Sequence, residues 1–335
     1  MVNKESMLFR KIYGCMMGGL IGDAMGAPGE NKTYQEIEKE FGWVEDFNGS
    51  GTDDSAVKMV LCDAIISNGG YITADEFADA FLGIGKKYFN MFYIPVKNMI
   101  YKVENKLCLP VYAGLGNMQS SSSAMAISPI GIINACNPRQ AALETYDVAG
   151  LIHAGDTTFC RDGACAIAAA VAEAMKPDAT VQSVLEAGTA YLHKTSSIVM
   201  KTLLKDILEM AKIENDYKKF REKFYASKLQ NVMCDSRETV PCVFALFHLA
   251  DGDPVKSITY AANFGRDTDT IATMIGAIAG AFKGVEGLKK EWVEKVETNN
   301  PGQKELAEKI TEVVYKRMED TAACLGMLSV LSQQR

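Results

Sequence analysis

Two acidic clusters contain the side chains best suited to chemistry. They occupy residues 49–55 and 265–270, and their oxygen-bearing side chains are Thr52, Asp53 and Asp54 in the first and Asp267, Asp269 and Thr270 in the second. Magnesium and manganese prefer oxygen ligands in octahedral geometry, commonly carboxylates together with water and substrate. The four carboxylates match two divalent ions in charge. The clusters therefore predict a site for two Mg²⁺ ions, with Mn²⁺ as an alternative.

Each cluster stands at the start of an expected helix. Apolar residues recur at helical spacing after Asp54, and a second apolar helix is expected from about Ile271. Adjacent carboxylates at a helix N-terminus can both point beyond its end, where the helix dipole stabilises each by about 0.3–1 kcal/mol. In the second cluster we expect an extended Asp-x-Asp segment with both carboxylates on one side. Either cluster alone would indicate helix capping, whereas the pair favours metal binding.

Glycines spaced four residues apart form two stripes. One consists of Gly14, Gly18, Gly22 and Gly26, and the other of Gly276, Gly280 and Gly284. On a helix this spacing places the glycines on one face, where another backbone can approach closely. Each glycine costs about 1 kcal/mol of helix propensity relative to alanine, so close packing must offset the loss. We expect these helices to press together and bring residues at their ends to one site; dense packing without a functional purpose is the alternative.

Helix-start signals recur along the chain, and strand-like alternation is scarce. Capping boxes begin at Thr33 and Thr73, while Asn137 and Asp253 each precede a proline suited to the first helical turn. The loosest segment, residues 105–123, is too short to separate domains and is expected to be a loop. The sequence predicts an all-α fold: a single compact multi-helix domain over residues 1–335, with a dinuclear metal cleft.

Composition excludes several classes of function. The formal net charge of −7 and the absence of a dense Lys/Arg run argue against a nucleic-acid partner or an anionic membrane surface. The longest apolar run, residues 271–282, is too short to span a membrane. Nine scattered cysteines without a C-x-x-C pair indicate reduced thiols and a cytoplasmic location. The three histidines lack paired metal spacing, so zinc is not expected.

Five motifs, taken in order, resemble the ADP-ribosylglycohydrolase family, which includes dinitrogenase reductase-activating glycohydrolase and the ADP-ribose-acceptor hydrolases. They lie at residues 14–30, 51–55, 128–131, 238–241 and 265–272. The resemblance covers most of the chain, and its paired acidic motifs make it specific. It implies an all-helical domain that holds two magnesium ions in a cleft and hydrolyses the bond between ribose C1″ and an acceptor.

The resemblance also implies roles for individual residues. Its metal ligands would be Thr52, Asp53, Asp54, Asp267, Asp269 and Thr270. Glu30 would lie in the family's flexible acidic loop beside the metals; a solvated loop carboxylate is the alternative. The proton would be handled by Glu30 or by an unshared aspartate oxygen, for which Asp54 is the candidate.

The chain departs from the family where the diphosphate of ADP-ribose would bind. Family members have a glycine-rich loop followed by Ala-Met-Arg, whereas residues 117–126 carry serines and lack the arginine. Ser121 and Ser122 are the candidate donors to the substrate. Arg266 can supply a replacement cation or neutralise nearby carboxylates. His153 matches a family histidine near the substrate and can equally be a satisfied structural histidine.

The leading hypothesis is a magnesium-dependent glycohydrolase acting on an ADP-ribosylated protein or an ADP-ribose derivative. One alternative is an N-glycosidase for a smaller ribosyl compound or nucleoside, favoured by the missing arginine. Others are a non-catalytic relative similar to a lens crystallin, and a magnesium phosphohydrolase. Ser236 and Glu238 are interpreted as helix caps. The motifs fix neither the acceptor, which could be arginine, serine, an acetyl ester or a nucleobase, nor the oligomeric state.

Overall fold

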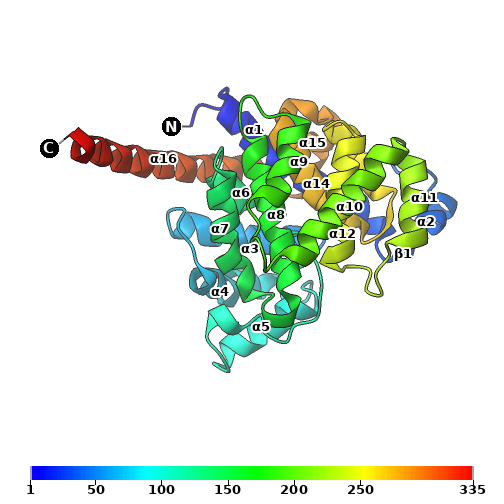
Figure 1. The fold of residues 1–335 in the computed structure, drawn as a ribbon, viewed down its shortest axis with the longest axis horizontal. Coiled ribbons are helices and arrows are strands. Elements are labelled where there is room, and N and C mark those ends of the chain that lie inside the picture. Colours follow the sequence, from blue (N-terminus) through cyan, green and yellow to red (C-terminus); the bar gives the residue numbers. More distant parts are fainter. Residues whose placement is uncertain (1, 334–335) are drawn as a thin grey trace.

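Helices make up nearly all of the regular structure in residues 2–333, the part of the chain that the computed structural model describes (Figure 1). Within that part the only strands are β1 (Lys32–Thr33) and β2 (Gly265–Arg266), which pair antiparallel. The all-α prediction is confirmed. The strand pair was not predicted, because two-residue strands are too short to show an alternating pattern.

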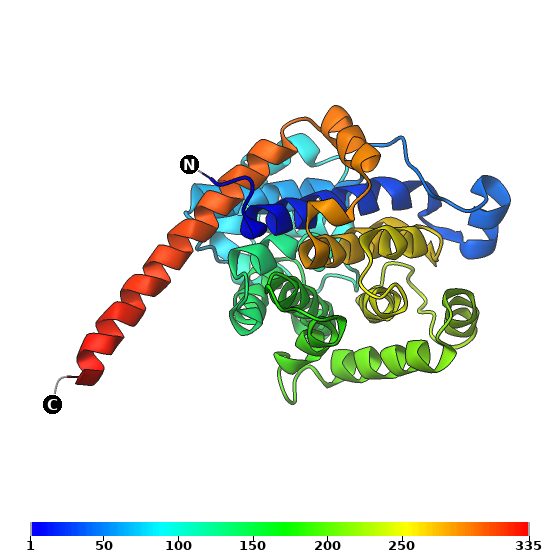
Figure 2. The ribbon, with the colours of Figure 1, turned by 90° about the horizontal axis from the view of Figure 1, so that it is seen from above.

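Two long helices pack tightly at the centre of the fold. α1 (Met7–Gly26) and α14 (Thr268–Lys283) run antiparallel, side by side in Figure 2. A Cβ atom added at Gly18 would lie 2.1 Å from the carbonyl oxygen of Gly276, and one at Gly14 would lie 2.5 Å from that of Gly280. The predicted role of the two glycine stripes is confirmed, since only glycine permits this approach. The C-terminal end of α1 thereby lies against the N-terminal end of α14.

The remaining helices surround this pair. α3 (Asp53–Ser67) contacts both α1 and α14, and α8 (Thr158–Ala174), α12 (Ser236–Leu249) and α13 (Pro254–Ala262) also pack on α14. The outer helices are α2 (Tyr34–Phe41), α4 (Ala74–Leu82), α5 (Ile94–Glu104), α6 (Ser128–Ile133), α7 (Pro138–Val148), α9 (Val181–Ala190), α10 (Ile198–Glu214), α11 (Tyr217–Ser227), α15 (Lys290–Asn299) and α16 (Gln303–Gln333). Short 3-10 turns are η1 (Ala27–Gly29), η2 (Ile84–Tyr88), η3 (Pro110–Tyr112), η4 (Ala149–Leu151), η5 (Gly155–Thr157) and η6 (Val285–Gly287).

The capping predictions at Thr33, Thr73, Asn137 and Asp253 are confirmed. Thr33 and Thr73 each form a capping box, and the side chains of Asn137 and Asp253 cap helices that begin with proline. The predicted start of the helix after the second acidic cluster was wrong. α14 begins at Thr268, so Asp269 lies in its first turn and the expected extended segment is already helical. The Thr268 hydroxyl donates to the carbonyl of Gly26 at 2.8 Å, which fixes this start against the end of α1.

The last helix leaves the body of the molecule. The first turns of α16 are buried, and the rest projects into solvent (Figures 1 and 2). The projecting part exposes six large apolar side chains: Met318, Leu325, Met327, Leu328, Val330 and Leu331. Among the described residues, no helix combines the length and the apolar character needed to cross a membrane.

Candidate metal centre

Three helix ends meet at one cavity. Glu30 follows η1 at the end of α1, Asp53 and Asp54 open α3, and Asp269 lies in the first turn of α14. The cavity has a volume of about 170 Å³. Eight residues singled out from the sequence line it: Glu30, Asp53, Asp54, Ser121, Ser122, Asp267, Asp269 and Thr270. The structure therefore brings together the two acidic clusters.

The carboxylates are not used as helix caps. Asp267 occupies the N-cap position of α14, yet its side chain makes no capping hydrogen bond to that helix, and α3 is capped by the hydroxyl of Thr52. Three buried oxygens, Oδ1 of Asp54, Oδ2 of Asp267 and Oδ1 of Asp269, have no hydrogen-bond partner among residues 2–333. Buried polar atoms nearly always have a hydrogen-bond or ionic partner, so these three oxygens are suited to binding a cation or a hydrogen-bond donor. Their chemistry fits a divalent metal ion.

Mutual proximity adds to this fit. Three carboxylate oxygens, one each from Glu30, Asp267 and Asp269, lie within 4.8 Å of one another. A single cation can bridge oxygens at this spacing. Thr52 and Thr270 direct their hydroxyls to Oδ2 of Asp54, at 3.2 and 3.4 Å respectively. Thr52 does not line the cavity, although its hydroxyl touches the Asp54 carboxylate that does.

Burial and mutual repulsion shift the pKa of these carboxyl groups upward. Burial, followed by the neighbouring carboxylates, raises the pKa of Asp54, Asp267 and Asp269 well above its usual range. Burial raises the pKa of Asp53 to about 6, against the hydrogen bond from the Tyr93 backbone. Cations at this position would remove the repulsion and favour the ionised forms.

Asp23 supports the site from beneath and was not assigned a role from the sequence. It is fully buried near the end of α1, and its carboxylate accepts the backbone N–H groups of Thr52, at 2.9 and 3.0 Å, and of Ser55, at 3.0 Å. It also accepts the Ser55 hydroxyl. Asp23 thus fixes the turn that presents the first acidic cluster. The sequence feature that could have identified Asp23 is the presence of a charged residue inside an apolar helix with a glycine stripe.

Lys58 supplies a buried positive charge one turn into α3. Its side chain packs against Gly19, where an added Cβ would lie 2.4 Å from Nζ, and Nζ has no hydrogen-bond partner among the described residues. Burial lowers the pKa of Lys58, while Asp23, Cys15 and Asp54 oppose that shift. This lysine partly offsets the negative charge beneath the cavity. It was missed because a lysine within an apolar helix gives no sign of the group that it faces.

Six further residues complete the cavity lining: Asn31, Tyr93, Met125, Val232, Met233 and Cys234. The backbone N–H of Tyr93 donates to Oδ2 of Asp53 at 2.9 Å and holds that carboxylate. Val232, Met233 and Cys234 belong to the loop between α11 and α12, which the sequence did not indicate. They form an apolar wall of the cavity, whose acidic residues are called its floor.

Comparison with known proteins identifies the family. A profile of the ADP-ribosylglycohydrolase family matches residues 4–323. The chain belongs to this family. Its members are hydrolases that act on glycosyl bonds, so the prediction of an ADP-ribosylglycohydrolase-type glycosidase is confirmed.

Relatives of this ADP-ribosylglycohydrolase match along most of its length. The Escherichia coli (strain K12) protein YegU is 25% identical over 305 residues, which cover 84% of this chain and 90% of the relative. ADP-ribosylhydrolase ARH3 of Bos taurus is 24% identical, covering 86% of this chain and 88% of the relative. A solved structure of an ADP-ribosylglycohydrolase-related protein complex has a TM-score of 0.68 at 17% identity, covering 92% and 98% of the two chains. That structure confirms the fold.

The serine segment of this glycohydrolase lies against the cavity. Ser121 donates to the carbonyl of Cys234 at 3.0 Å and contacts Oγ1 of Thr239 at 2.5 Å, so its hydroxyl is already engaged. The Ser122 hydroxyl accepts a hydrogen bond from Ser120 at 2.9 Å, which leaves its own hydrogen available to a ligand.

His153 lies behind the serine segment rather than in the cavity lining. It is fully buried, and its ring nitrogens contact Ser120 Oγ at 3.1 Å and Ser123 Oγ at 2.9 Å. Burial lowers the pKa of His153 to about 4, so the ring is neutral at physiological pH. The contacts match the structural reading of this histidine, and its predicted contact with substrate is not seen in the cavity lining.

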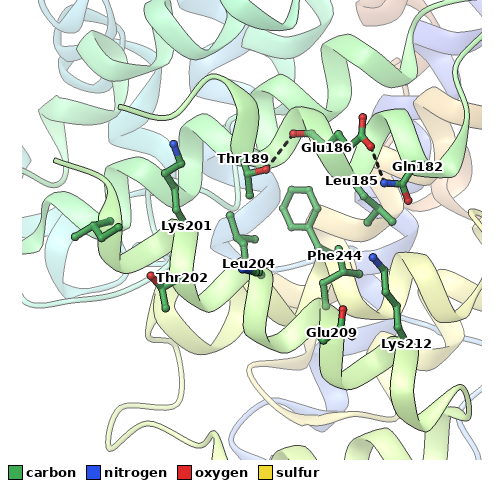
Figure 3. Close-up of a pocket in the computed structure, with 13 residues that line it drawn as sticks. Gln182, Leu185, Glu186, Thr189, Lys201, Thr202, Leu204, Glu209, Lys212 and Phe244 are labelled. Atoms are coloured by element: carbon green, nitrogen blue, oxygen red, sulfur yellow. Dashed lines mark hydrogen bonds between the residues drawn. The ribbon is translucent and has the colours of Figure 1, made fainter. Parts of the chain in front are cut away.

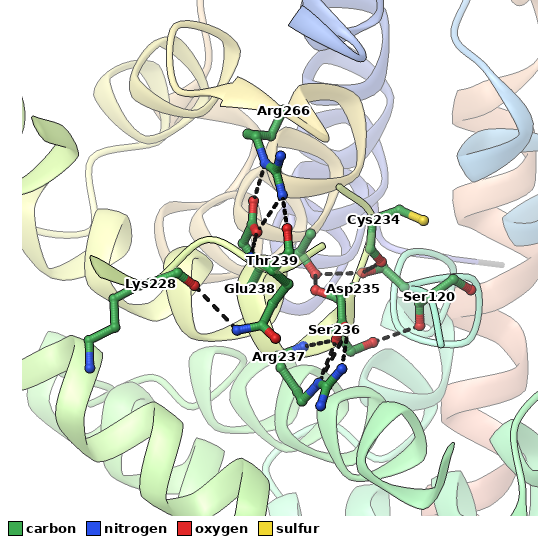
Figure 4. Close-up of polar contacts among 11 residues, drawn as sticks. Ser120, Lys228, Cys234, Asp235, Ser236, Arg237, Glu238, Thr239 and Arg266 are labelled. Atoms are coloured by element: carbon green, nitrogen blue, oxygen red, sulfur yellow. Dashed lines mark hydrogen bonds and ion pairs between the residues drawn. The ribbon is translucent and has the colours of Figure 1, made fainter. Parts of the chain in front are cut away.

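Arg266 also lies outside the cavity lining. Its guanidinium forms two 2.8 Å hydrogen bonds with the buried Glu238 carboxylate (Figure 4). The interpretation of Ser236 and Glu238 as helix caps was wrong: Asp235 caps α12, and the Ser236 hydroxyl donates to the Ser120 carbonyl. Of the two alternatives for Arg266, the structure shows neutralisation of a carboxylate, although the partner is Glu238 and not an aspartate of the cluster.

A larger groove, of about 510 Å³, lies between α9 and α10 (Figure 3). Its floor is apolar and includes Leu185, Leu204 and Phe244. The carboxylate of Glu186 on its rim is bound by Gln182 of the same helix at 2.7 Å. None of the described residues that line the groove carries a buried polar side-chain atom without a partner, in contrast to the acidic cavity, which is therefore the candidate site.

Proposed function

We propose that the acidic cavity binds two Mg²⁺ ions and hydrolyses the bond between ribose C1″ and an acceptor in an ADP-ribosylated protein or an ADP-ribose derivative. The observation that carries this proposal is the set of three buried, unpartnered aspartate oxygens at one cavity. The family of the chain supports the glycosidic reaction. The similarity to ADP-ribosylhydrolase ARH3 supports an ADP-ribosyl substrate.

Six residues would hold the ions: Thr52, Asp53, Asp54, Asp267, Asp269 and Thr270. When bound, Mg²⁺ or Mn²⁺ would orient the sugar hydroxyls and stabilise developing charge. The set contains only oxygen donors, as these hard cations require.

Glu30 is the proposed proton acceptor. It is exposed, lines the cavity, and places a carboxylate oxygen within 4.8 Å of ligand oxygens of Asp267 and Asp269. A water at the cavity could therefore lose its proton to Glu30 as its oxygen bonds to C1″ and the bond between C1″ and the acceptor breaks. Glu30 could then pass the proton to the departing acceptor. Asp54 is the second candidate, but it is buried and its Oδ2 already faces the hydroxyls of Thr52 and Thr270. Glu30 is more accessible to water and to substrate.

The size of the cavity indicates which part of the substrate can enter it. Its 170 Å³ is smaller than the roughly 300–1,000 Å³ of pockets that enclose a drug-sized ligand. We infer that the ribose enters the cavity and the rest of ADP-ribose lies across its mouth. Ser122, a buried residue of the lining with an available hydroxyl hydrogen, is the candidate donor to the diphosphate from within the cavity.

A second candidate function is hydrolysis of a smaller ribosyl compound or a nucleoside. None of the described residues that line the cavity is lysine or arginine, and the guanidinium of Arg266 is bound to Glu238. Without a cation, the diphosphate would contribute little binding energy. In that case the ribose alone would have to provide most of the recognition.

A substrate panel separates the two candidates. In Mg²⁺, kcat/KM would be measured for an ADP-ribosylated peptide, O-acetyl-ADP-ribose, nucleosides and phosphate esters. The main proposal predicts release of free ADP-ribose and a kcat/KM lower by about one to two powers of ten for compounds without the ADP portion, which lose charge-assisted hydrogen bonds. Equal rates for nucleosides would favour the second candidate. Release of phosphate alone would refute both.

We also infer that residues 1–335 form one domain in a reducing, cytoplasmic compartment. One contiguous hydrophobic core includes residues from Phe9 to Val314, with no break at which a second core begins. All nine cysteines lie in the described part of the chain and are free thiols there, which suits a reducing compartment.

A further inference from the structure

The apolar wall of the cavity is a loop without regular structure, residues 228–235, between α11 and α12. It contributes Val232, Met233 and Cys234 to the lining. A loop of this kind has no helical or sheet hydrogen bonds to set its position. Its placement at the cavity depends on side chains that hold its backbone.

One ion pair holds both backbone polar groups of Gln230 in this loop. Glu238 Oε2 accepts the Gln230 N–H at 2.6 Å, and Arg266 Nη2 donates to the Gln230 carbonyl at 2.6 Å. Arg266 and Glu238 are joined to each other by two parallel hydrogen bonds (Figure 4). Glu238 is fully buried, and Arg266 is 8% exposed. A bidentate pair fixes orientation as well as distance, so residue 230 is held on both sides.

Arg266 is joined to the acidic floor through its backbone. It directly precedes Asp267, and its carbonyl accepts the N–H of Asn31, the residue after Glu30, at 2.8 Å. Its φ of 71° is unfavourable for a residue other than glycine, so surrounding contacts must maintain it. Arg266 is therefore connected to the Glu30 segment, to Asp267 and to the apolar wall. The far end of the loop is fastened separately, by the Ser121 hydroxyl on the Cys234 carbonyl.

We propose that Arg266 and Glu238 are positioning residues that set the apolar wall against the metal-binding floor and so determine the affinity for substrate. Neither residue lines the cavity. This proposal rests on the function proposed above. It gives Arg266 a task different from the binding of diphosphate, because its guanidinium is committed to Glu238 and Gln230.

The test compares Glu238→Gln and Arg266→Lys with Arg237→Gln as the matched control. Each test variant keeps a side chain of similar size but removes part of the bidentate pair. Arg237 is adjacent to Glu238 in the sequence and forms its ion pair with Asp235 (Figure 4). The two side-chain bonds to the Gln230 backbone come from Glu238 and Arg266 instead. In both test variants KM for an ADP-ribosylated peptide should rise roughly tenfold or more, with kcat changed by less than about threefold. Binding of Mn²⁺ should stay within about twofold, and the control should resemble the wild type.

Amide hydrogen exchange gives a readout that does not depend on activity. The amide of Gln230 should exchange faster in both test variants and not in Arg237→Gln. If the wild type shows no glycohydrolase activity, the proposed function fails, while exchange still decides whether the pair holds the loop. If a single variant does not fold, Arg266→Met/Glu238→Leu replaces it, since removing both charges leaves no unpaired buried charge.

Two results would overturn the proposal. One is an unchanged KM and unchanged Gln230 exchange in the test variants, including the case in which only their melting temperatures fall. The other is a loss of kcat and of Mn²⁺ affinity at constant KM, which would mean that the pair acts on the metal floor.

Discussion

At the scale of single residues, the crowded carboxylates should make the metal-free protein sensitive to pH. In the folded state burial raises the pKa of Asp53 from 3.8 to about 6. A raised pKa means that the folded protein binds the proton more tightly than the unfolded chain does. The resulting stabilisation is complete below the unfolded pKa and is lost as the pH rises through about 6.

We therefore expect Asp53→Asn, which cannot ionise, to gain stability relative to the wild type as the pH is raised. In EDTA the two proteins should melt at similar temperatures near about pH 4, and the variant should melt higher at about pH 7. Asp178→Asn, at an exposed position outside the cavity, is the control. A difference between Asp53→Asn and the wild type that does not vary with pH would contradict this expectation.

The sequence identified those site residues that belong to short motifs of neighbouring residues. Asp53, Asp54, Asp267, Asp269 and Thr270 were singled out from short motifs, and all five line one cavity. Asp23, Lys58 and Gln230 were not assigned, because the groups that they bind or face are distant in sequence or are backbone groups. The type of residue alone cannot show that a buried aspartate accepts the amides of a turn that follows much later in the chain.

At the scale of helices, the site depends on how closely α1 and α14 approach. The glycine stripes allow backbone-to-backbone contact, which brings the end of α1 to the start of α14 and places Glu30 beside Asp267 and Asp269. A methyl group at the closest crossing would force the two helices apart.

Gly18→Ala should therefore destabilise the fold, although alanine favours helices. Its Cβ would lie 2.1 Å from the Gly276 carbonyl oxygen, and overpacking of this kind costs about 1–3 kcal/mol or more, against a propensity gain of about 1 kcal/mol. Gly326→Ala is the matched control, since it lies within α16 with no atom within 4 Å of the added Cβ. Chemical denaturation should show a loss for the first variant and none for the second. Equal stability of Gly18→Ala and the wild type would disprove the role of the stripe.

Helix starts were predicted correctly where the capping residues lie close together in the sequence. The capping boxes at Thr33 and Thr73 were recognisable because each uses residues only three positions apart. The start of α14 was placed too late, since the hydrogen bond that fixes Thr268 comes from Gly26 at the end of α1. The pairing of β1 with β2 likewise joins segments far apart in the chain.

At the scale of the molecule, the cavity is assembled from segments spread over most of the chain. Residues near 30, 53, 93, 121, 233 and 268 line it, and no window of sequence contains more than a part. The all-α class followed from the density of helix starts, and resemblance to a family supplied the expected convergence of the acidic clusters. The projecting half of α16 was not anticipated, because its apolar residues resemble those of a buried helix.

Release of ADP-ribose from an ADP-ribosylated peptide, measured with EDTA-treated protein before and after Mg²⁺ is added, tests the central claim most directly. The proposed chemistry needs cations among the aspartates, so the treated protein should be inactive and Mg²⁺ should restore release. Asp269→Ala should remain inactive in Mg²⁺ while its circular dichroism stays helical. Release at an undiminished rate in EDTA, or by Asp269→Ala, would contradict the assignment of this cavity as a metal-dependent glycohydrolase site.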